Sequence, residues 1–450
     1  MRSGLIAAVL GAALAALPVR AFAEDIVVSE PAALTRAIQS ANPGDRIILA
    51  PGDYRMGSAT VDIRRPGRAD RPIVMRAATA GRARIHSATV ELFKVFAPYW
   101  TFEGLDFVGN DGTHHAFHVV AGADRTTFRG NRFRDFHAAI KGNAEGGRRP
   151  DHVVVERNVI FNTGKRRTEE PVTPIDVVQA TGWVVRENFI ADFAKDGGDE
   201  TSYAAFFKGG STDGVFERNL VICEWHHTGG YRVGLSFGGG GSPREYWTQN
   251  GEEHARGVMR NNIIANCPNA EGIYINRSGG AKIYNNTIYN AYGIMARFAA
   301  APSDVRNNIV SGAVATHDGA RLVTGENLET GLALGNSLPG AVRTLKRRLE
   351  GHPRLAWLDG PIDVLADWLA ESSFGRGVGD FDHWFAAPGR GDFAAKDVDR
   401  IMQKGERRPE VEDDFCGQKR LGATDLGAIE YTAGKCDSAA WSARLLATFN

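Results

Sequence analysis

The chain has 450 residues, with 53 basic and 53 acidic side chains, so its formal net charge is zero. A neutral chain has no overall field to attract nucleic acid or an anionic membrane, which disfavours both as partners. The 53 glycines favour many short strands with tight turns over a helical fold.

The N-terminus has the pattern of a secretory signal peptide. Arg2 precedes the apolar run 5–17, and residues 21–23 (AFA) have the small-x-small form of a cleavage site. This run is too short to span a bilayer, and no later stretch is long and apolar enough to do so. We therefore expect a periplasmic or secreted monomer without a membrane span.

Downstream, residues 30–45 have the pattern of one amphipathic helix, followed by the strand "RIILAPGDY". A helix at this place would cover the open strand edge of the first coil of a β-rich fold.

The middle of the chain is a repeat. An asparagine flanked by aliphatic or aromatic residues recurs at positions 131, 158, 188, 219, 262, 286 and 308, and Leu105 takes the same place one repeat earlier. Spacings of this size indicate a solenoid, and the absence of helical periodicity makes it a β-solenoid. Stacked asparagines would satisfy one another at a buried turn, because an amide both donates and accepts hydrogen bonds.

A second row of strands lies between the asparagines. Alternate side chains of a strand face opposite sides, so the polar residues of this row should share the outer face. In "FFKGGS", Lys208 points outward if Phe207 lies in the core, and the two glycines then let the chain turn away. The polar residues of this row are Lys141, Asp176, Lys208, Tyr274, Asn276 and Arg297.

The repeats fade after about residue 322, where 340–351 and 362–372 have a helical pattern. We expect a signal peptide at 1–23, an N-terminal cap with the solenoid at 24–330, and an extension packed on the solenoid at 331–450. Export permits disulfides between the four cysteines, at positions 223, 267, 416 and 436. Three pairings are possible, and the sequence alone does not choose between them.

With these coils the chain resembles the right-handed parallel β-helix proteins of the pectate-lyase superfamily. "ANPGDRIILAPGDY", "RPIVMRAA" and "WTFEGLDF" are similar to the first coils of chondroitinase-B-like and alginate-lyase-like enzymes. "FFKGGS" resembles the strand of family 9 pectate lyases that presents a lysine base beside calcium-binding aspartates. The resemblance implies an all-β fold and Lys208 as the base. It also implies Asp176, with Asp196, Asp199 or Glu200, as candidate ligands of Ca²⁺.

The chemistry of such an enzyme favours further residues. Cleavage of a uronate polymer by elimination needs a base for the proton beside the carboxylate, and positive charge to stabilise the intermediate. The loop "EWHHTGGYRVGLSFGGGGS" precedes the strand after Lys208, so His226, His227 and Tyr231 are candidates for the acid. Candidate substrate contacts are Lys141, Arg232, Tyr274, Asn276, Arg277 and Arg297.

Three functions stay open. The favoured one is a secreted lyase acting on an acidic polysaccharide, and the first alternative is a non-catalytic carbohydrate-binding β-helix. A glycoside hydrolase would need two carboxylates roughly 5 to 9.5 Å apart, for which Asp176 and Asp199 are the attractive pair. The charged stretch 244–257 offers Glu252, Glu253 and His254 for a metal site or as a hydrolase acid, but a solvated loop is the favoured interpretation.

Overall fold

The structure is a computed structural model that describes residues 23–298, 301–331 and 377–449, with isolated positions 342, 361, 362 and 364. Nearly all of the predicted signal peptide, and most of the two helices predicted between 340 and 372, lie outside these residues. Within them, no helix has the length and apolar character needed to cross a membrane.

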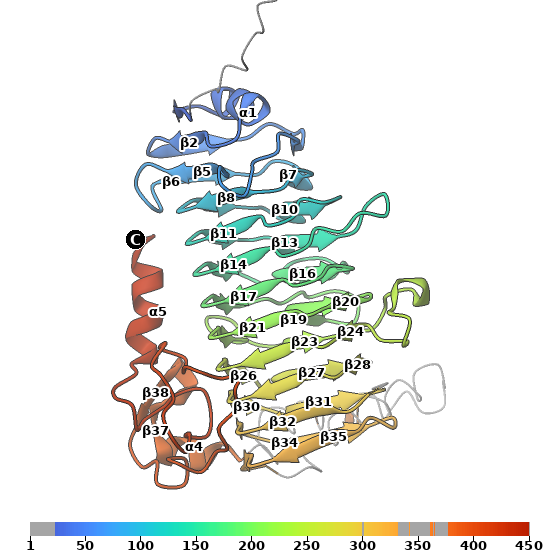
Figure 1. Cartoon of the computed structure of the whole chain (residues 1–450), viewed down its shortest axis with the longest axis vertical. Coiled ribbons are helices and arrows are strands. Elements are labelled where there is room, and N and C mark those ends of the chain that lie inside the picture. The colour runs from blue at the N-terminus through green and yellow to red at the C-terminus, as the bar shows by residue number, and fades with distance from the viewer. Residues whose placement is uncertain are drawn as a thin grey trace, which may run out of the picture.

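The chain winds through three long parallel sheets that stack coil upon coil (Figure 1). Sheet A consists of β1 (Asp25–Val28), β2 (Arg46–Leu49), β5 (Ile73–Ala77), β8 (Trp100–Glu103), β11 (Thr127–Arg129), β14 (Val154–Glu156), β17 (Val184–Arg186), β21 (Val215–Glu217), β25 (Val258–Arg260), β29 (Lys282–Tyr284), β32 (Ser303–Arg306) and β35 (Leu322–Gly325). Sheet B consists of β3 (Gly52–Arg55), β6 (Ala83–His86), β9 (Asp106–Val108), β12 (Arg132–Arg134), β15 (Val159–Phe161), β18 (Phe189–Ala191), β22 (Leu220–Ile222), β26 (Ile263–Cys267), β30 (Thr287–Ala291), β33 (Ile309–Val310) and β36 (Leu328–Glu329).

Sheet C carries the strand row singled out in the sequence. It consists of β4 (Val61–Ile63), β7 (Glu91–Val95), β10 (His115–Val120), β13 (Ala138–Asn143), β16 (Ile175–Val178), β19 (Thr201–Lys208), β23 (Tyr231–Phe237), β27 (Ile273–Asn276), β31 (Gly293–Arg297) and β34 (Ala313–His317). A short fourth sheet joins β20 (Ser211–Thr212), β24 (His254–Ala255) and β28 (Ser278–Gly279). The predicted right-handed parallel β-helix is confirmed.

The N-terminal cap is also confirmed. Helix α1 (Pro31–Ser40) buries Leu34, Ala37 and Ile38 on the first coil, and Figure 1 shows it at the end of the stack. The helix is shorter than predicted, since Pro43 disfavours helical backbone at Asn42. Strand β1, which the sequence analysis did not predict, precedes the helix and pairs with β2.

Inside the coils, side chains of one kind stack on their equivalents. Phe102 stacks on Phe128 from sheet A at 5.2 Å between ring centroids, and Phe107 stacks on Phe133 from sheet B at 4.9 Å. All four rings are fully buried. Burial of such large rings is a main source of stability for the fold.

The asparagine column lies between sheets A and B. The backbone N–H and Nδ2 of Asn188 both donate to Oδ1 of Asn219, at 3.1 and 3.0 Å, and Nδ2 also donates to the Val155 carbonyl. The same pattern links Asn131, Asn158, Asn188, Asn219, Asn262, Asn286, Asn308 and Asn327. The predicted column is confirmed, and Asn327 extends it by a residue that the repeat analysis missed.

The C-terminal extension covers the outer face of sheet B. It contains α4 (Val378–Trp384), β37 (Phe385–Ala387), β38 (Asp392–Ala395) and α5 (Ser438–Ala447), and it runs along the side of the stack (Figure 1). Its apolar side chains form one buried cluster with outward residues of sheet B, such as Phe385 with Leu220 and Ile263. The described part of the extension, 377–449, thus packs on the β-helix.

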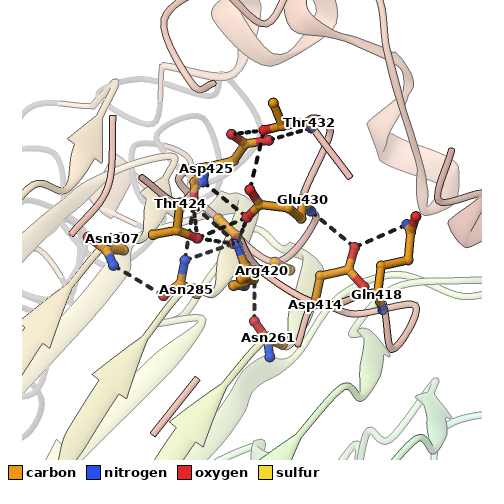
Figure 2. A network of polar contacts seen from close by, with 12 residues as sticks. Asn261, Asn285, Asn307, Asp414, Gln418, Arg420, Thr424, Asp425, Glu430 and Thr432 are labelled. Carbon is orange, nitrogen blue, oxygen red and sulfur yellow. Dashed lines mark hydrogen bonds and ion pairs between the residues drawn. The ribbon is translucent and has the colours of Figure 1, made fainter. Parts of the chain in front are cut away.

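A polar network joins this extension to the turns of the last coils (Figure 2). Arg420 is buried, donates to Glu430 at 2.7 Å, and reaches Oδ1 of Asn261 at 2.9 Å. Asn285 donates to the Asp425 carbonyl, and Asn307 donates to the Glu406 carbonyl. Each of these asparagines immediately precedes a member of the buried column and has a positive φ, which turns its side chain outward.

Both disulfides join pairs that the sequence had left open. Cys223 pairs with Cys267 on the next coil, and Cys416 pairs with Cys436 within the extension. The first therefore ties two coils together beyond β22, and the second closes a loop of the extension. These two bridges account for all four cysteines.

Candidate functional site

The outer face of sheet C bears a continuous row of polar side chains on its earlier strands, from β7 to β16. The register pairs Lys94 with His118, His118 with Lys141, and Lys141 with Asp176. Adjacent coils are about 4.8 Å apart, so the row presents charge at nearly regular intervals along the axis. Such spacing suits an extended charged polymer better than a compact ligand.

Lys208 lies beside the end of this row. It is the last residue of β19, with Phe207 in the core and Lys208 on the outer face, as predicted. Its strand neighbour Val178 is two positions beyond Asp176, so Lys208 and Asp176 share a face. The chain then turns away at Gly209 and Gly210, and a Cβ on Gly210 would lie 1.9 Å from the Tyr246 carbonyl oxygen.

The surroundings of Lys208 lower its pKa, so its ammonium group loses a proton more readily than that of a surface lysine. Burial lowers its pKa, the Asp176 carboxylate opposes this, and the positive charge of Lys141 lowers the pKa further. Its Nζ lies over the Phe206 ring at 4.2 Å and 3.5 Å from the Gly240 carbonyl oxygen. The net effect is a lowered pKa, which is what a lysine base requires.

Lys141 and Asp176 form the ion pair beside it. Nζ of Lys141 lies 2.6 Å from Oδ2 of Asp176, and the second carboxylate oxygen of Asp176 is buried without a hydrogen-bond partner among the described residues. The pair keeps one cation and one anion fixed on the outer face next to Lys208.

Further toward the N-terminus, a carboxylate meets two histidines. Oε1 of Glu91 lies 3.2 Å from Nδ1 of His115 and 2.7 Å from Nδ1 of His118. Contact with both imidazoles holds the pKa of Glu91 well below its usual range. Burial lowers the pKa of His115 although Glu91 opposes it.

A glycine-rich segment, 238–241, covers the same face one coil after Lys208. The Tyr203 hydroxyl donates to the Gly239 carbonyl at 3.2 Å, and Phe206 and Ser236 beneath are buried. The carboxylate of Glu253 fixes the segment by accepting from the N–H groups of Gly239 and Gly240, at 2.8 and 2.9 Å. The open part of the face therefore lies on the N-terminal side of Lys208.

The interpretation of 244–257 as a solvated loop is wrong for its second half. Glu252, Glu253 and His254 are buried, at 5%, 1% and 0% exposure. His254 accepts or donates a hydrogen bond at 2.9 Å with Ser211 and stacks on Phe237. Burial lowers the pKa of His254 to about 3, so it is neutral. These three side chains are therefore packed inside the protein and do not form a solvated surface.

The histidine-rich loop does not lie beside Lys208, contrary to the expectation for His226, His227 and Tyr231. Tyr231 begins β23 and pairs with Thr201, whereas Lys208 is seven positions further along β19. At 3.3 Å per residue the two ends are roughly 23 Å apart. His226 and His227 come before Tyr231 at the same far edge, where both contact Asp192.

Arg232 is likewise not placed for a substrate contact. Its side chain is buried, and the guanidinium donates to the carbonyls of Cys223 and Gly229 and lies 3.0 Å from Nδ1 of His227. The sequence could not show this, because the carbonyls that accept from Arg232 belong to the loop before β23, whose conformation depends on these same hydrogen bonds.

The four acidic residues proposed for calcium are not brought together. Asp176 pairs with Phe206 in the register, and Thr201 lies five positions, roughly 17 Å, before Phe206. Asp196, Asp199 and Glu200 all precede Thr201, and Asp199 is held there by Lys195 at 2.9 Å and by the Thr201 N–H. This residue set does not fit a calcium ion. The same separation excludes Asp176 and Asp199 as a glycosidase pair.

The remaining predicted contacts lie on later coils. Tyr274 continues the Asp176 row after Phe206 and Ser236, and burial raises its pKa to about 12. Arg297 is paired with Asp318 at 2.5 Å, and Asn276 is buried beside the glycine-rich segment. Arg277 turns aside at the strand end and lies over the Trp247 ring at 4.5 Å. The segment 238–241 thus separates these residues from Lys141 and Asp176.

Five residues of the face were missed by the sequence analysis: Glu91, Lys94, His115, His118 and Asn143. "FHVVAG" had been recognised as a strand of the row, and aligning it with "AAIKGN" would have put His118 next to Lys141. Glu91 and Lys94 lie in a coil before the first asparagine of the column, so no repeat marker gives their register.

Comparison with known proteins agrees with this architecture. The family model described as chondroitinase B matches residues 28–115. No curated protein sequence matches the chain. The crystal structure of pectate lyase Pel9A is similar with a TM-score of 0.58 at 14% identity, covering 91% of this chain and 97% of that one.

Two further solved structures are more distant. A PL6 family polysaccharide lyase from Pseudopedobacter saltans gives a TM-score of 0.38 at 14% identity over 68% of this chain and 92% of that one. The GH136 lacto-N-biosidase from Eubacterium ramulus gives 0.42 at 11% identity over 68% of each chain. The predicted resemblance to parallel β-helix polysaccharide lyases is confirmed, and the likeness to Pel9A shows a shared fold.

Proposed function

We propose that this protein is a secreted polysaccharide lyase that cleaves a uronate-containing polymer by β-elimination on the outer face of sheet C. The observation that carries the proposal is the placement of Lys208, half-buried with a lowered pKa, beside the Lys141–Asp176 ion pair. The row of Lys94, His118 and Lys141 leads up to it. Its two lysines, paired with Glu145 and Asp176, place ammonium groups on the face that a polyanion would contact.

In this mechanism neutral Lys208 takes the proton from C5 of the uronate, next to its carboxylate. The electron pair of the C5–H bond forms the C4–C5 double bond while the bond from C4 to the leaving oxygen breaks, and that oxygen receives a proton from water. Lys141 stabilises the negative charge that builds up on the carboxylate, since it is fixed there in advance by Asp176. The base then returns its proton to solvent.

Calcium supplies the positive charge in the pectate lyases that the lysine strand resembles. Here no step is derived through it, because Asp176 lies on sheet C beside Phe206 whereas Asp196, Asp199 and Glu200 lie before the start of β19. The proposed mechanism therefore relies on lysine side chains of this chain, above all Lys141, to stabilise the negative charge of the intermediate.

The proposal is tested with the purified mature chain and a panel of uronate polymers, such as pectate, alginate and dermatan sulfate. A lyase produces a conjugated double bond, so ultraviolet absorbance should rise together with new reducing ends, and Lys208→Ala should abolish both. New reducing ends without absorbance would instead indicate a hydrolase. Saturable binding without either product would indicate the non-catalytic alternative.

A further inference from the structure

Glu91, His115 and His118 place three potential metal ligands on one patch of sheet C. One oxygen of Glu91 and one nitrogen of each imidazole all lie within 4.8 Å of one another. Glu91 comes from β7 and both histidines come from β10, so two paired strands of a rigid sheet hold the three groups. A site on such elements is more ordered than one on loops.

The hydrogen bonds around His118 determine which of its nitrogens is free. Nδ2 of Asn143 donates to the Ala144 carbonyl at 2.9 Å, which leaves Oδ1 of Asn143 facing Nε2 of His118 at 2.6 Å. That oxygen only accepts, so Nε2 must carry the hydrogen and Nδ1 of a neutral imidazole bears a lone pair. This arrangement, in which the second ring nitrogen donates to an oxygen, is typical of metal-ligating histidines.

The second nitrogen of His118 faces the Glu91 carboxylate. Nδ1 is buried and lies 2.7 Å from Oε1 of Glu91. Two lone pairs at this distance repel each other, so the contact needs either a proton on Nδ1 or a metal ion that both atoms coordinate. The two atoms are therefore placed to share one metal ion when the imidazole is neutral.

The kinds of ligand decide the kind of cation. Two imidazoles and one carboxylate form a set that binds Zn²⁺ and related transition metals, with further coordination positions open to solvent or substrate. Ca²⁺ and Mg²⁺ prefer sites made of oxygen ligands alone. We propose that Glu91, His115 and His118 bind one divalent transition-metal ion on the outer face of sheet C.

This site is distinct from the calcium set expected from the sequence, and it does not depend on lyase activity. It borders the proposed substrate face, because His118 pairs directly with Lys141 in the register. A metal ion here would add positive charge between Lys94 and Lys141 on this face.

The test is isothermal titration calorimetry of the chelator-treated mature chain with ZnCl₂. We expect one equivalent of Zn²⁺ to bind with saturation, and excess Ca²⁺ not to displace it. Glu91→Gln, which keeps size and shape, and His118→Ala should each weaken Kd at least tenfold. Asn143→Ala, which removes only the partner of His118, should weaken it by about 10- to 100-fold.

His317→Ala is the matched control, since His317 is an exposed histidine on the last strand of the same sheet. It should bind Zn²⁺ as the wild type does. The proposal is overturned if the wild type shows no saturable binding, if Glu91→Gln binds as tightly as the wild type, or if Ca²⁺ displaces the ion. Circular dichroism verifies folding, and Glu91→Gln decides the question if His118→Ala does not fold.

Discussion

Nζ of Lys141 lies 2.6 Å from Oδ2 of Asp176 on the next coil, and this pair stands beside the half-buried ammonium group of Lys208. The two members of the pair have opposite effects on the proton of Lys208: Asp176 favours the charged form of Lys208 and Lys141 disfavours it. Substitutions of Lys208 and Asp176 can therefore show whether Lys208 acts as a base or only binds the polymer through its positive charge.

Lys208→Arg should abolish turnover while preserving binding. Arginine keeps the positive charge but stays protonated in proteins, so it cannot take a proton. If Lys208 is the base, kcat on a cleaved uronate polymer should fall by about 10² or more, the lower range for general-base catalysis. Steady-state kinetics and a binding assay on the same polymer measure the two effects. An arginine variant with near wild-type kcat would leave Lys208 only a binding role.

Asp176→Asn should move the pH dependence of catalysis toward acid. The Asp176 carboxylate raises the pKa of Lys208, so its removal lets burial and Lys141 lower that pKa further. A base is active when deprotonated, and the acidic limb of the kcat/KM profile should therefore shift to lower pH. The profile is measured on the same polymer for both proteins. A shift toward alkaline pH would contradict the assignment of Lys208 as the base.

Asn219→Ala should strongly destabilise the fold. It removes the acceptor for two donors of Asn188 and leaves them buried. An unsatisfied buried group costs about 1 to 3 kcal/mol, so the loss in unfolding free energy should be several kcal/mol. Urea unfolding followed by circular dichroism measures this. Asn250→Ala, at an exposed loop position, is the control and should have little effect; equal losses in the two variants would refute the column's role in stability.

His254→Phe should reduce the sensitivity of the protein to acid. Burial lowers the pKa of His254 from 6.5 to about 3, so between these values the unfolded chain binds a proton that the folded chain does not. Wild-type stability should therefore fall as the pH drops through this range, by about 1.4 kcal/mol per pH unit for this group. Phenylalanine preserves the stacking on Phe237 and removes the titration.

Urea unfolding at several pH values between 6.5 and 4 tests this prediction. The curve of His254→Phe should be flatter than that of the wild type, although its stability near pH 7 falls from loss of the Ser211 hydrogen bond. Parallel curves would show that His254 is not the neutral buried group described here.

The sequence by itself determined the β-helix, because each coil must repeat its inward residues and carries an asparagine at the same buried turn. It also determined that Lys208 and Phe207 face opposite sides of their strand, and the structure then placed Phe207 in the core and Lys208 outside. Some readable signals were overlooked. The pairs at 261–262, 285–286 and 307–308 double the asparagine in the last coils, and the first of each pair binds the extension.

Only the tertiary structure decided which residues meet across the face of sheet C. A loop can lie at either end of the strand that follows it in a coil, and periodicity does not say which. The prediction put His226 and His227 near Lys208 at the end of β19, whereas they lie near its start. Equally, Glu253 and His254 read as charged and solvated, whereas in the structure Glu253 is buried against the glycine-rich segment and His254 against Phe237. Contacts such as those between Glu91, His115 and His118 depend on the register between coils of unequal length, which is fixed by packing in three dimensions.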